Sequence, residues 1–239
     1  MTKKVVLFIH GFSAKKEDNL AFLEEMNHRK KIEMHTFILP GHETKRMGKV
    51  KYQDWLDASE KELQKLLKNH SQITIVGHSM GTIIALYLAA HYPQVEKLVL
   101  ISPAYYFGNL EQNKKDMYRL FRREIDPNIG TGFEGFFQKL WTVPFSRFLE
   151  YRKLVKNTED SISEIQCPTL ILHGTEDNVV PIRSSLYVYN ALTCEKHLTF
   201  IEDTRHQVFK SQKAKAISTY IYEYIMGGIL FKMNQKDIL

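Results

Sequence analysis

Short apolar runs rich in β-branched residues alternate along the chain with segments whose apolar residues recur at helical spacing. The short runs predict buried strands, because a strand that is covered on both faces has no polar side. The longer segments predict helices. The predicted strands are residues 3–9, 32–39, 73–76, 95–102, 169–173 and 197–201, and the predicted helices are 17–28, 54–69, 80–92, 183–192 and 207–226. This alternation predicts the α/β class, with a mostly parallel six-stranded sheet flanked by helices.

One segment, residues 105–163, interrupts the alternation and divides the predicted core into residues 1–104 and 164–239. Twelve of the 28 aromatic residues of the chain lie between Tyr105 and Tyr151. They could form the core of an additional helical layer, or line a lid that receives an apolar group. We favour a helical cap that acts as a lid, because it follows the carboxyl end of a strand, where ligands bind in α/β sheets. Phe137 and Trp141 are candidate substrate-binding residues within it.

Length and composition narrow the class further. A chain of 239 residues with 44% hydrophobic residues fits one α/β domain, with or without an insertion. The start of the chain does not resemble a signal peptide, and no stretch has the length of a membrane-spanning helix. The two cysteines, Cys167 and Cys194, lack metal-site spacing and predict free thiols in a reducing cytoplasm. The net charge of +6 is scattered along the chain, so we expect no binding to nucleic acid.

The sequence GHSMG at residues 77–81 follows the third predicted strand and precedes an apolar helix. Strand, tight turn and helix, with a serine between two glycines, is the arrangement of a nucleophile elbow. Such a turn strains Ser79 so that its hydroxyl projects from the sheet edge. Gly77 and Gly81 let the strand and the helix approach closely. Ser79 is therefore the candidate nucleophile.

A serine hydroxyl needs an adjacent base, and that base needs a carboxylate to orient it. After such an elbow the acid precedes the histidine along the chain, each in a loop that follows a strand. The loop after residues 169–173 offers Asp177 as the acid, with Glu176 and Asp203 as weaker rivals. The loop after the last predicted strand offers His206 as the base.

Two backbone N–H groups are expected to stabilise the oxyanion that forms when a serine attacks a carbonyl group. We expect one from Met80, directly after the nucleophile, and the other from Phe12, in the loop after the first strand. For the remaining histidines we expect structural roles. His10, His78 and His173 adjoin strand ends, and His197 is expected at the surface or at the end of an element.

Together these motifs resemble the α/β-hydrolase superfamily, and within it the small bacterial carboxylesterases and monoacylglycerol lipases. The matching motifs are HGF at 10–12, PGHE at 40–43, GHSMG at 77–81, HGTED at 173–177 and RHQVF at 205–209. The resemblance implies ester hydrolysis by Ser79, His206 and Asp177 without a cofactor or a metal ion. Glu43 departs from it, because such enzymes often have glycine there. A serine at position 79 argues against the branch that uses an aspartate nucleophile.

The sequence therefore predicts a serine hydrolase that cleaves carboxylic esters of short to medium acyl chains through an acyl-enzyme. Its expected partner is a small-molecule ester. The alternatives are another serine-dependent activity on this fold, as a thioesterase, aminopeptidase, C–C bond hydrolase or cofactor-free peroxidase, and a non-catalytic binding protein. The physiological substrate and the oligomeric state stay open at this point.

Overall fold

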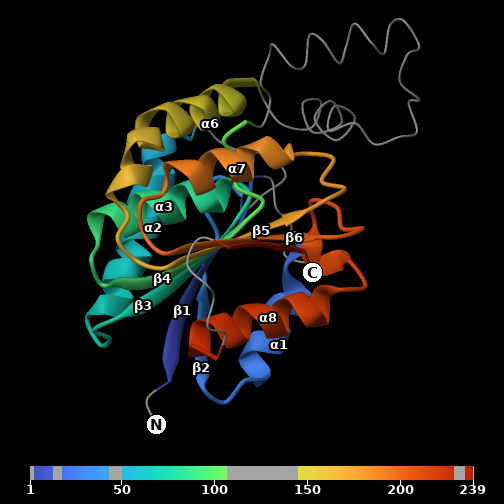
Figure 1. Cartoon of the computed structure of the whole chain (residues 1–239). Helices are drawn as coiled ribbons and strands as arrows, with labels where there is room; N and C mark the ends of the chain where they lie inside the picture. Colours follow the sequence, from blue (N-terminus) through green and yellow to red (C-terminus); the bar gives the residue numbers. More distant parts are fainter. Residues whose placement is uncertain (1–2, 13–17, 43–49, 107–144, 229–234, 239) are drawn as a thin grey trace, which may run out of the picture.

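Seven strands form a single sheet in the order β2-β1-β3-β4-β5-β6-β7, and every neighbouring pair is parallel. The computed structural model describes residues 3–12, 18–42, 50–106, 145–228 and 235–238 (Figure 1). The strands are β1 (Lys4–Ile9), β2 (Ile32–Thr36), β3 (Ile73–His78), β4 (Val95–Ile101), β5 (Thr169–Gly174), β6 (Lys196–Ile201) and β7 (Gln235–Ile238). The predicted α/β class is confirmed.

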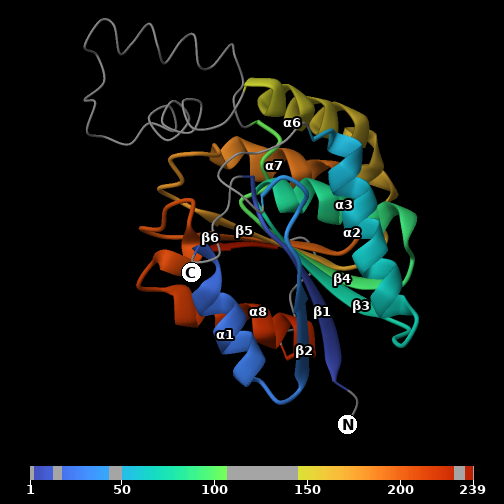
Figure 2. The ribbon, with the colours of Figure 1, turned by 180° about the vertical axis from the view of Figure 1, so that it is seen from behind.

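Helices cover both faces of the sheet, as the two opposite views show (Figures 1 and 2). The helices on one face are α2 (Tyr52–Leu67), α3 (Met80–His91), α6 (Phe145–Thr158) and α7 (Ile182–Ala191), and those on the other are α1 (Leu20–His28) and α8 (Ala214–Met226). Short 3₁₀ helices span Glu159–Glu164 and Val208–Lys210. Each face of the sheet therefore has its own hydrophobic core.

The strand sequences explain the two cores. In β1, Val5, Leu7 and Ile9 pack in the core beneath α2 and α3, whereas Val6 and Phe8 pack in the core beneath α1 and α8. Successive side chains of a strand point to opposite faces, so a strand between two helical layers must be apolar at every position. This requirement produces the uninterrupted apolar runs of the sequence.

Helix α3 carries apolar residues on all sides, and nine of its twelve residues are buried. It lies between the sheet and α6, so each of its faces meets protein. A helix that is buried over most of its surface needs apolar residues around most of its circumference, and α3 is therefore not amphipathic. Its first residue directly follows Ser79, and the rigid packing of α3 therefore fixes the position of that serine.

The predicted helix 207–226 begins later than expected, at Ala214. Before it, Val208 and Phe209 lie in a short 3₁₀ turn and are buried. The Phe209 ring stacks on Phe22 of α1, with 4.6 Å between ring centroids. This anchor holds the segment after residue 206 against the core, so tertiary packing overrides the helical pattern there. The helix ends at Gly227 as predicted, with a left-handed φ of 74°.

Two strand predictions also need correction. The strand predicted at residues 32–39 ends at Thr36, because the chain turns inward there and the Leu39 N–H bonds to the ring of His10. The sheet has a seventh strand, β7, which pairs in parallel with β6. As a result β6 is not an edge strand. His197, which we expected at the surface or at an element end, is the second residue of β6 and is buried.

The described part of the segment 105–163 packs on the core. Tyr105, Phe148 and Tyr151 are buried in the cluster that contains α2 and α3, and the Tyr151 hydroxyl donates a hydrogen bond to the Ala104 carbonyl. These three rings support the interpretation of an additional helical layer. Residues 107–144, which include Phe137 and Trp141, lie outside the described residues, and the lid stays a prediction.

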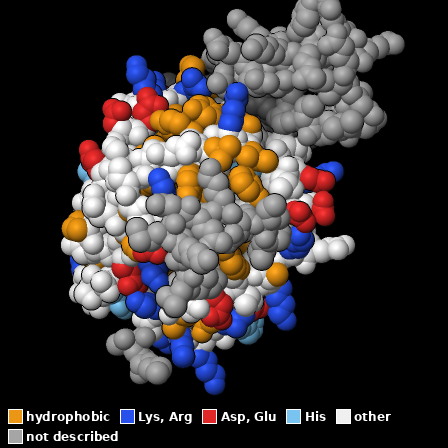
Figure 3. Space-filling view, in the orientation of Figure 1, with side chains coloured by type: hydrophobic (Ala, Val, Ile, Leu, Met, Phe, Trp, Pro, Cys, Tyr) orange, Lys and Arg blue, Asp and Glu red, His pale blue; other side chains and the backbone are white. Residues whose placement is uncertain are grey.

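Charged side chains of both signs are interspersed on the face of the molecule shown in Figure 3. Within the described ranges, none of the helices combines the length and the apolar character needed to cross a membrane. Within the same ranges, no group of three or more His, Cys, Asp or Glu side chains is arranged to hold a metal ion.

Candidate active site

Ser79 has the strained backbone of a nucleophile elbow, with φ of 55° and ψ of −118°. A residue with a Cβ rarely adopts a positive φ, and the surrounding structure must enforce it. The Ser79 N–H donates to the Ile101 carbonyl at 2.8 Å, and the Thr82 hydroxyl donates to the Ser79 carbonyl at 2.6 Å. These two bonds fix the peptide groups on both sides of the serine, at the carboxyl edge of the sheet.

Three glycines make room for this turn. A Cβ at Gly77 would lie 2.6 Å from the Gly81 carbonyl oxygen, and a Cβ at Gly81 would lie 2.1 Å from the carbonyl oxygen of Ile9. A Cβ at Gly11 would lie 2.9 Å from Cβ of Ser79 itself. Any larger residue would therefore push apart β1, β3 and α3. Gly77 and Gly81 are the two glycines of the predicted elbow, whereas the close approach of Gly11 to Ser79 was not predicted.

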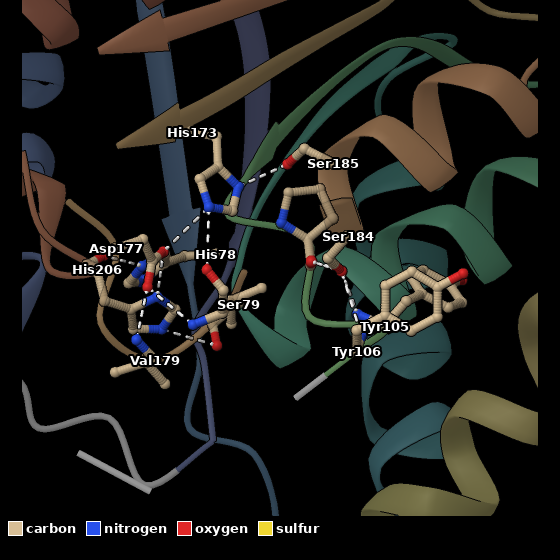
Figure 4. A network of polar contacts seen from close by, with 12 residues as sticks. His78, Ser79, Tyr105, Tyr106, His173, Asp177, Val179, Ser184, Ser185 and His206 are labelled. Atoms are coloured by element: carbon tan, nitrogen blue, oxygen red, sulfur yellow. Dashed lines mark hydrogen bonds and ion pairs between the residues drawn. The ribbon is translucent and has the colours of Figure 1, made fainter. Parts of the chain in front are cut away.

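The structure brings together the three residues that the sequence analysis selected from separate loops (Figure 4). His206 Nε2 lies 3.0 Å from the Ser79 Oγ, and His206 Nδ1 lies 2.8 Å from Asp177 Oδ2. All three side chains are almost completely buried. A carboxylate can only accept, so Nδ1 carries the proton, and Nε2 is free to accept the proton of the serine hydroxyl.

Asp177 is held by the backbone of its own loop. Its Oδ1 accepts hydrogen bonds from the N–H groups of Val179 at 2.9 Å and Val180 at 2.8 Å. Burial alone would raise the pKa of this carboxyl group. The hydrogen bond of His206, its positive charge when it is protonated, and the Val180 N–H together outweigh burial, so the pKa of Asp177 lies well below its usual range. Asp177 is therefore ionised at neutral pH.

Hydrogen bonds join the loop that carries Asp177 to the loop that carries His206. The Glu176 N–H donates to the Thr204 carbonyl at 3.0 Å, and the Asp203 N–H donates to the Thr175 hydroxyl at 3.1 Å. The side chains of the two rival acids, Glu176 and Asp203, are exposed. Asp177 is the carboxylate that contacts His206.

His78 holds the backbone of His206 through a hydrogen bond. Its Nε2 lies 3.0 Å from the His206 carbonyl oxygen, and because that oxygen only accepts, Nε2 carries a proton. The two imidazole rings are tilted at 33°, with their centroids 5.1 Å apart. His78 is a buried scaffold residue, as its place at a strand end suggested.

The loop after β1 passes directly beside Ser79 and is itself braced by His10. His10 Nδ1–H donates to the Gly11 carbonyl at 2.9 Å, and its Nε2 accepts the Leu39 N–H at 3.0 Å. The Phe12 ring packs 6.0 Å from Trp55 and 5.8 Å from Tyr151, measured between centroids. The backbone at Phe12 is thus anchored from both sides, next to the first turn of α3, where free N–H groups occur.

A cleft of about 430 Å³ opens beside His206. Asn178 and Val179 line it from the loop after β5, and Arg205, Gln207 and Lys210 line it from the loop after β6. A volume of this size accommodates a small organic group. Periodicity could not reveal this cleft, because it depends on how two loops lie side by side.

Sequence patterns identify the family. The model of the alpha/beta hydrolase fold family matches residues 4–153, more than half of the chain. The chain therefore belongs to the α/β-hydrolase fold family. A second family model, described as serine aminopeptidase S33, matches residues 140–213.

Individual relatives and solved structures agree with this assignment. A thermostable monoacylglycerol lipase from Bacillus sp. (strain H-257) is 25% identical over 213 residues, which are 84% of this chain and 82% of the relative. A structure from work on two metagenome-derived lipolytic enzymes, LipS and LipT, has a TM-score of 0.76 at 18% identity and covers 95% of this chain and 94% of its own. A soluble variant of monoglyceride lipase from Saccharomyces cerevisiae has a TM-score of 0.70 at 17% identity, and the match covers 96% of this chain and 88% of that one. At such identities the structural likeness establishes the fold.

Proposed function

We propose that this protein is a serine hydrolase that cleaves carboxylic esters through an acyl-enzyme. The observation that carries the proposal is the continuous chain of contacts from Ser79 Oγ through His206 to Asp177, with distances of 3.0 and 2.8 Å. Nucleophile and base lie within hydrogen-bond reach, and a third group orients the base. The names of the relatives, a monoacylglycerol lipase and other lipolytic enzymes, support ester cleavage in particular.

In the proposed mechanism Ser79 Oγ attacks the ester carbonyl carbon while His206 Nε2 takes its proton. The N–H groups of Met80 and Phe12 then donate hydrogen bonds to the tetrahedral oxyanion and stabilise its charge. Asp177 stabilises the imidazolium without itself becoming protonated. The imidazolium gives its proton to the departing alcohol oxygen, and an acyl group remains on Ser79. A water molecule, activated in the same way, releases the carboxylic acid and restores the serine.

The cleft beside His206 offers a place for the alcohol part of the ester, because it adjoins the histidine that protonates the departing oxygen. The acyl chain would lie toward the cap, where aromatic residues are dense in the sequence. On this basis we propose short to medium acyl chains as the preferred substrates. His206 must be neutral to act, so kcat/KM should fall on the acid side of its pH profile.

Peptide or amide cleavage is the second candidate, because the serine aminopeptidase family model matches residues 140–213. A panel of related substrates distinguishes ester, thioester and amide cleavage. The panel contains p-nitrophenyl butyrate, the butyryl thioester of a small thiol, butyryl p-nitroanilide and an alanyl p-nitroanilide. We expect kcat/KM to be highest for the oxygen ester. Greater turnover of an anilide would favour the aminopeptidase, and faster thioester cleavage would favour the thioesterase.

A further inference from the structure

His173 is a fully buried histidine next to the proposed site, and the mechanism above does not use it. It lies in β5, four residues before Asp177. Its Nδ1 is 2.7 Å from the Ser185 hydroxyl of α7, and its Nε2 is 3.1 Å from the Val180 carbonyl oxygen (Figure 4). Its Nε2 also lies 3.6 Å from Asp177 Oδ2. Both ring nitrogens therefore have defined neighbours.

These contacts fix the proton on one nitrogen of His173. The Val180 carbonyl can only accept, so Nε2 carries the proton, and Nδ1 accepts the hydrogen of the Ser185 hydroxyl. Burial lowers the pKa of His173, although the charge of Asp177 acts in the opposite direction. The ring is therefore neutral. This matters because a charged His173 would compete with His206 for the same carboxylate oxygen.

The residue that His173 binds is also one that holds the carboxylate. The Val180 carbonyl accepts from His173, while the N–H of the same residue donates to Asp177 Oδ1 at 2.8 Å. We infer that His173, locked by Ser185, is a positioning residue that sets the Val180 backbone and through it the carboxylate of Asp177. This inference rests on the proposed function, because it assigns Asp177 the task of orienting His206.

Helix α7 offers a matched control in the neighbouring residue. Ser184 and Ser185 are adjacent and fully buried in the first turn of α7. Ser184 Oγ donates to the Pro103 carbonyl and accepts the Tyr105 N–H at 2.9 Å, so it holds the start of the segment 105–163 and not the acid loop. Ser184→Ala and Ser185→Ala each remove one buried hydroxyl. Only Ser185→Ala removes a hydrogen bond of His173.

The test compares full-length variants with p-nitrophenyl butyrate over pH 5 to 9. His173→Leu removes both hydrogen bonds at similar volume, whereas a glutamine at 173 can still donate to Val180 and accept from Ser185. We expect His173→Leu to lower kcat by about tenfold or more, because small misplacements of catalytic groups have large kinetic costs. We expect KM to change less than twofold, and His173→Gln to recover most of kcat.

The pH profile separates positioning from mere support of the fold. The titratable groups that face His173 are Asp177 and His206. If Asp177 is displaced, the imidazolium of His206 loses part of its stabilisation, and the acid limb of kcat/KM moves to lower pH. We expect this movement in His173→Leu and Ser185→Ala. Ser184→Ala should lower Tm but keep kcat and the acid limb.

Proton NMR adds a readout that does not require turnover. The Nδ1–H of His206, bonded to a carboxylate, should give a downfield proton resonance in the wild type that is retained in His173→Gln and lost in His173→Leu. A folded His173→Leu that keeps this resonance, kcat and the acid limb would overturn the inference. If His173→Leu does not fold, identical kcat and acid limbs in Ser185→Ala and Ser184→Ala would overturn it. A wild type that gives the resonance but cleaves no ester would contradict the proposed function instead.

Discussion

Replacing Asp177 by asparagine changes one oxygen into an NH₂ group with almost no change of volume. Oδ1 of the native residue accepts two backbone N–H groups, from Val179 and Val180. The single oxygen of an asparagine must stay in that position, because two buried N–H groups without partners would each cost about 1–3 kcal/mol. The NH₂ group then faces His206 Nδ1, where Asp177 Oδ2 now accepts a hydrogen bond at 2.8 Å.

An NH₂ group donates, so Nδ1 of His206 must lose its proton and Nε2 must carry it. Nε2 then cannot accept the proton of Ser79, and the histidine is in the wrong tautomer for catalysis. In serine hydrolases the loss of the correct tautomer costs about 10⁴-fold in kcat. That factor corresponds to about 5.4 kcal/mol of transition-state stabilisation. We expect a fall of this size in Asp177→Asn with the fold retained.

Initial rates with p-nitrophenyl butyrate give kcat, and circular dichroism melting shows whether the variant is folded. Asp177→Ala is the comparison. Unlike Asp177→Asn, it leaves the N–H groups of Val179 and Val180 without an acceptor, so it should melt at a lower temperature. Glu176→Gln tests the neighbouring acid, and we expect it to keep at least half of kcat. A folded Asp177→Asn with more than about a tenth of wild-type kcat would refute the role of Asp177. A collapse of kcat in Glu176→Gln instead would assign that role to Glu176.

Burial lowers the pKa of His42 to about 4, against about 6.5 for an unfolded histidine. At a pH between these two pKa values the unfolded state binds a proton that the folded state does not bind. The free energy of unfolding therefore falls from pH 7 to pH 5 by up to about 2 kcal/mol, and urea unfolding of His42→Gln should lose this pH dependence. Gly81→Ala places a Cβ 2.1 Å from a backbone oxygen of β1, and we expect a loss of about 2 kcal/mol or more in urea unfolding. Gly227→Ala, whose new Cβ would have its nearest neighbour at 3.9 Å, should lose only about 1 kcal/mol through its positive φ. Lengthening the acyl group of p-nitrophenyl esters from two to four carbons should raise kcat/KM roughly tenfold, at about 0.8 kcal/mol per methylene. A chain-length profile unchanged in both Phe137→Ala and Trp141→Ala, with only Tm lowered, would make those rings part of the cap core.

The sheet could be predicted because a strand buried on both faces has few alternatives to an apolar run. The selection of Ser79 followed from the GHSMG motif, and that of Asp177 and His206 from their place in loops that follow predicted strands. The carboxyl ends of parallel strands meet at one edge, so residues there are brought together whatever the loops between them. Side-chain periodicity, which placed the strands, and the serine motif together located the site before any distance was available.

Other features depended on contacts between distant segments and were not visible in the pattern. Residues 207–213 have helical periodicity, but Phe209 packs on Phe22 and the helix starts only at Ala214. The hydrogen bond between His173 and Ser185, beside Asp177, joins a strand and a helix whose contact is tertiary. β7 has only four residues and follows a segment without a clear period.

The most direct test of the account is where a covalent probe binds. A fluorophosphonate reacts with an activated serine hydroxyl, and peptide mass mapping identifies the modified residue. We predict one adduct, on the peptide that contains Ser79, with no labelling of Ser79→Ala and a loss of at least about 10³-fold in its kcat while its melting curve stays close to that of the wild type. Labelling that persists in Ser79→Ala, or an adduct on any other residue, would contradict the assignment of Ser79 as the nucleophile.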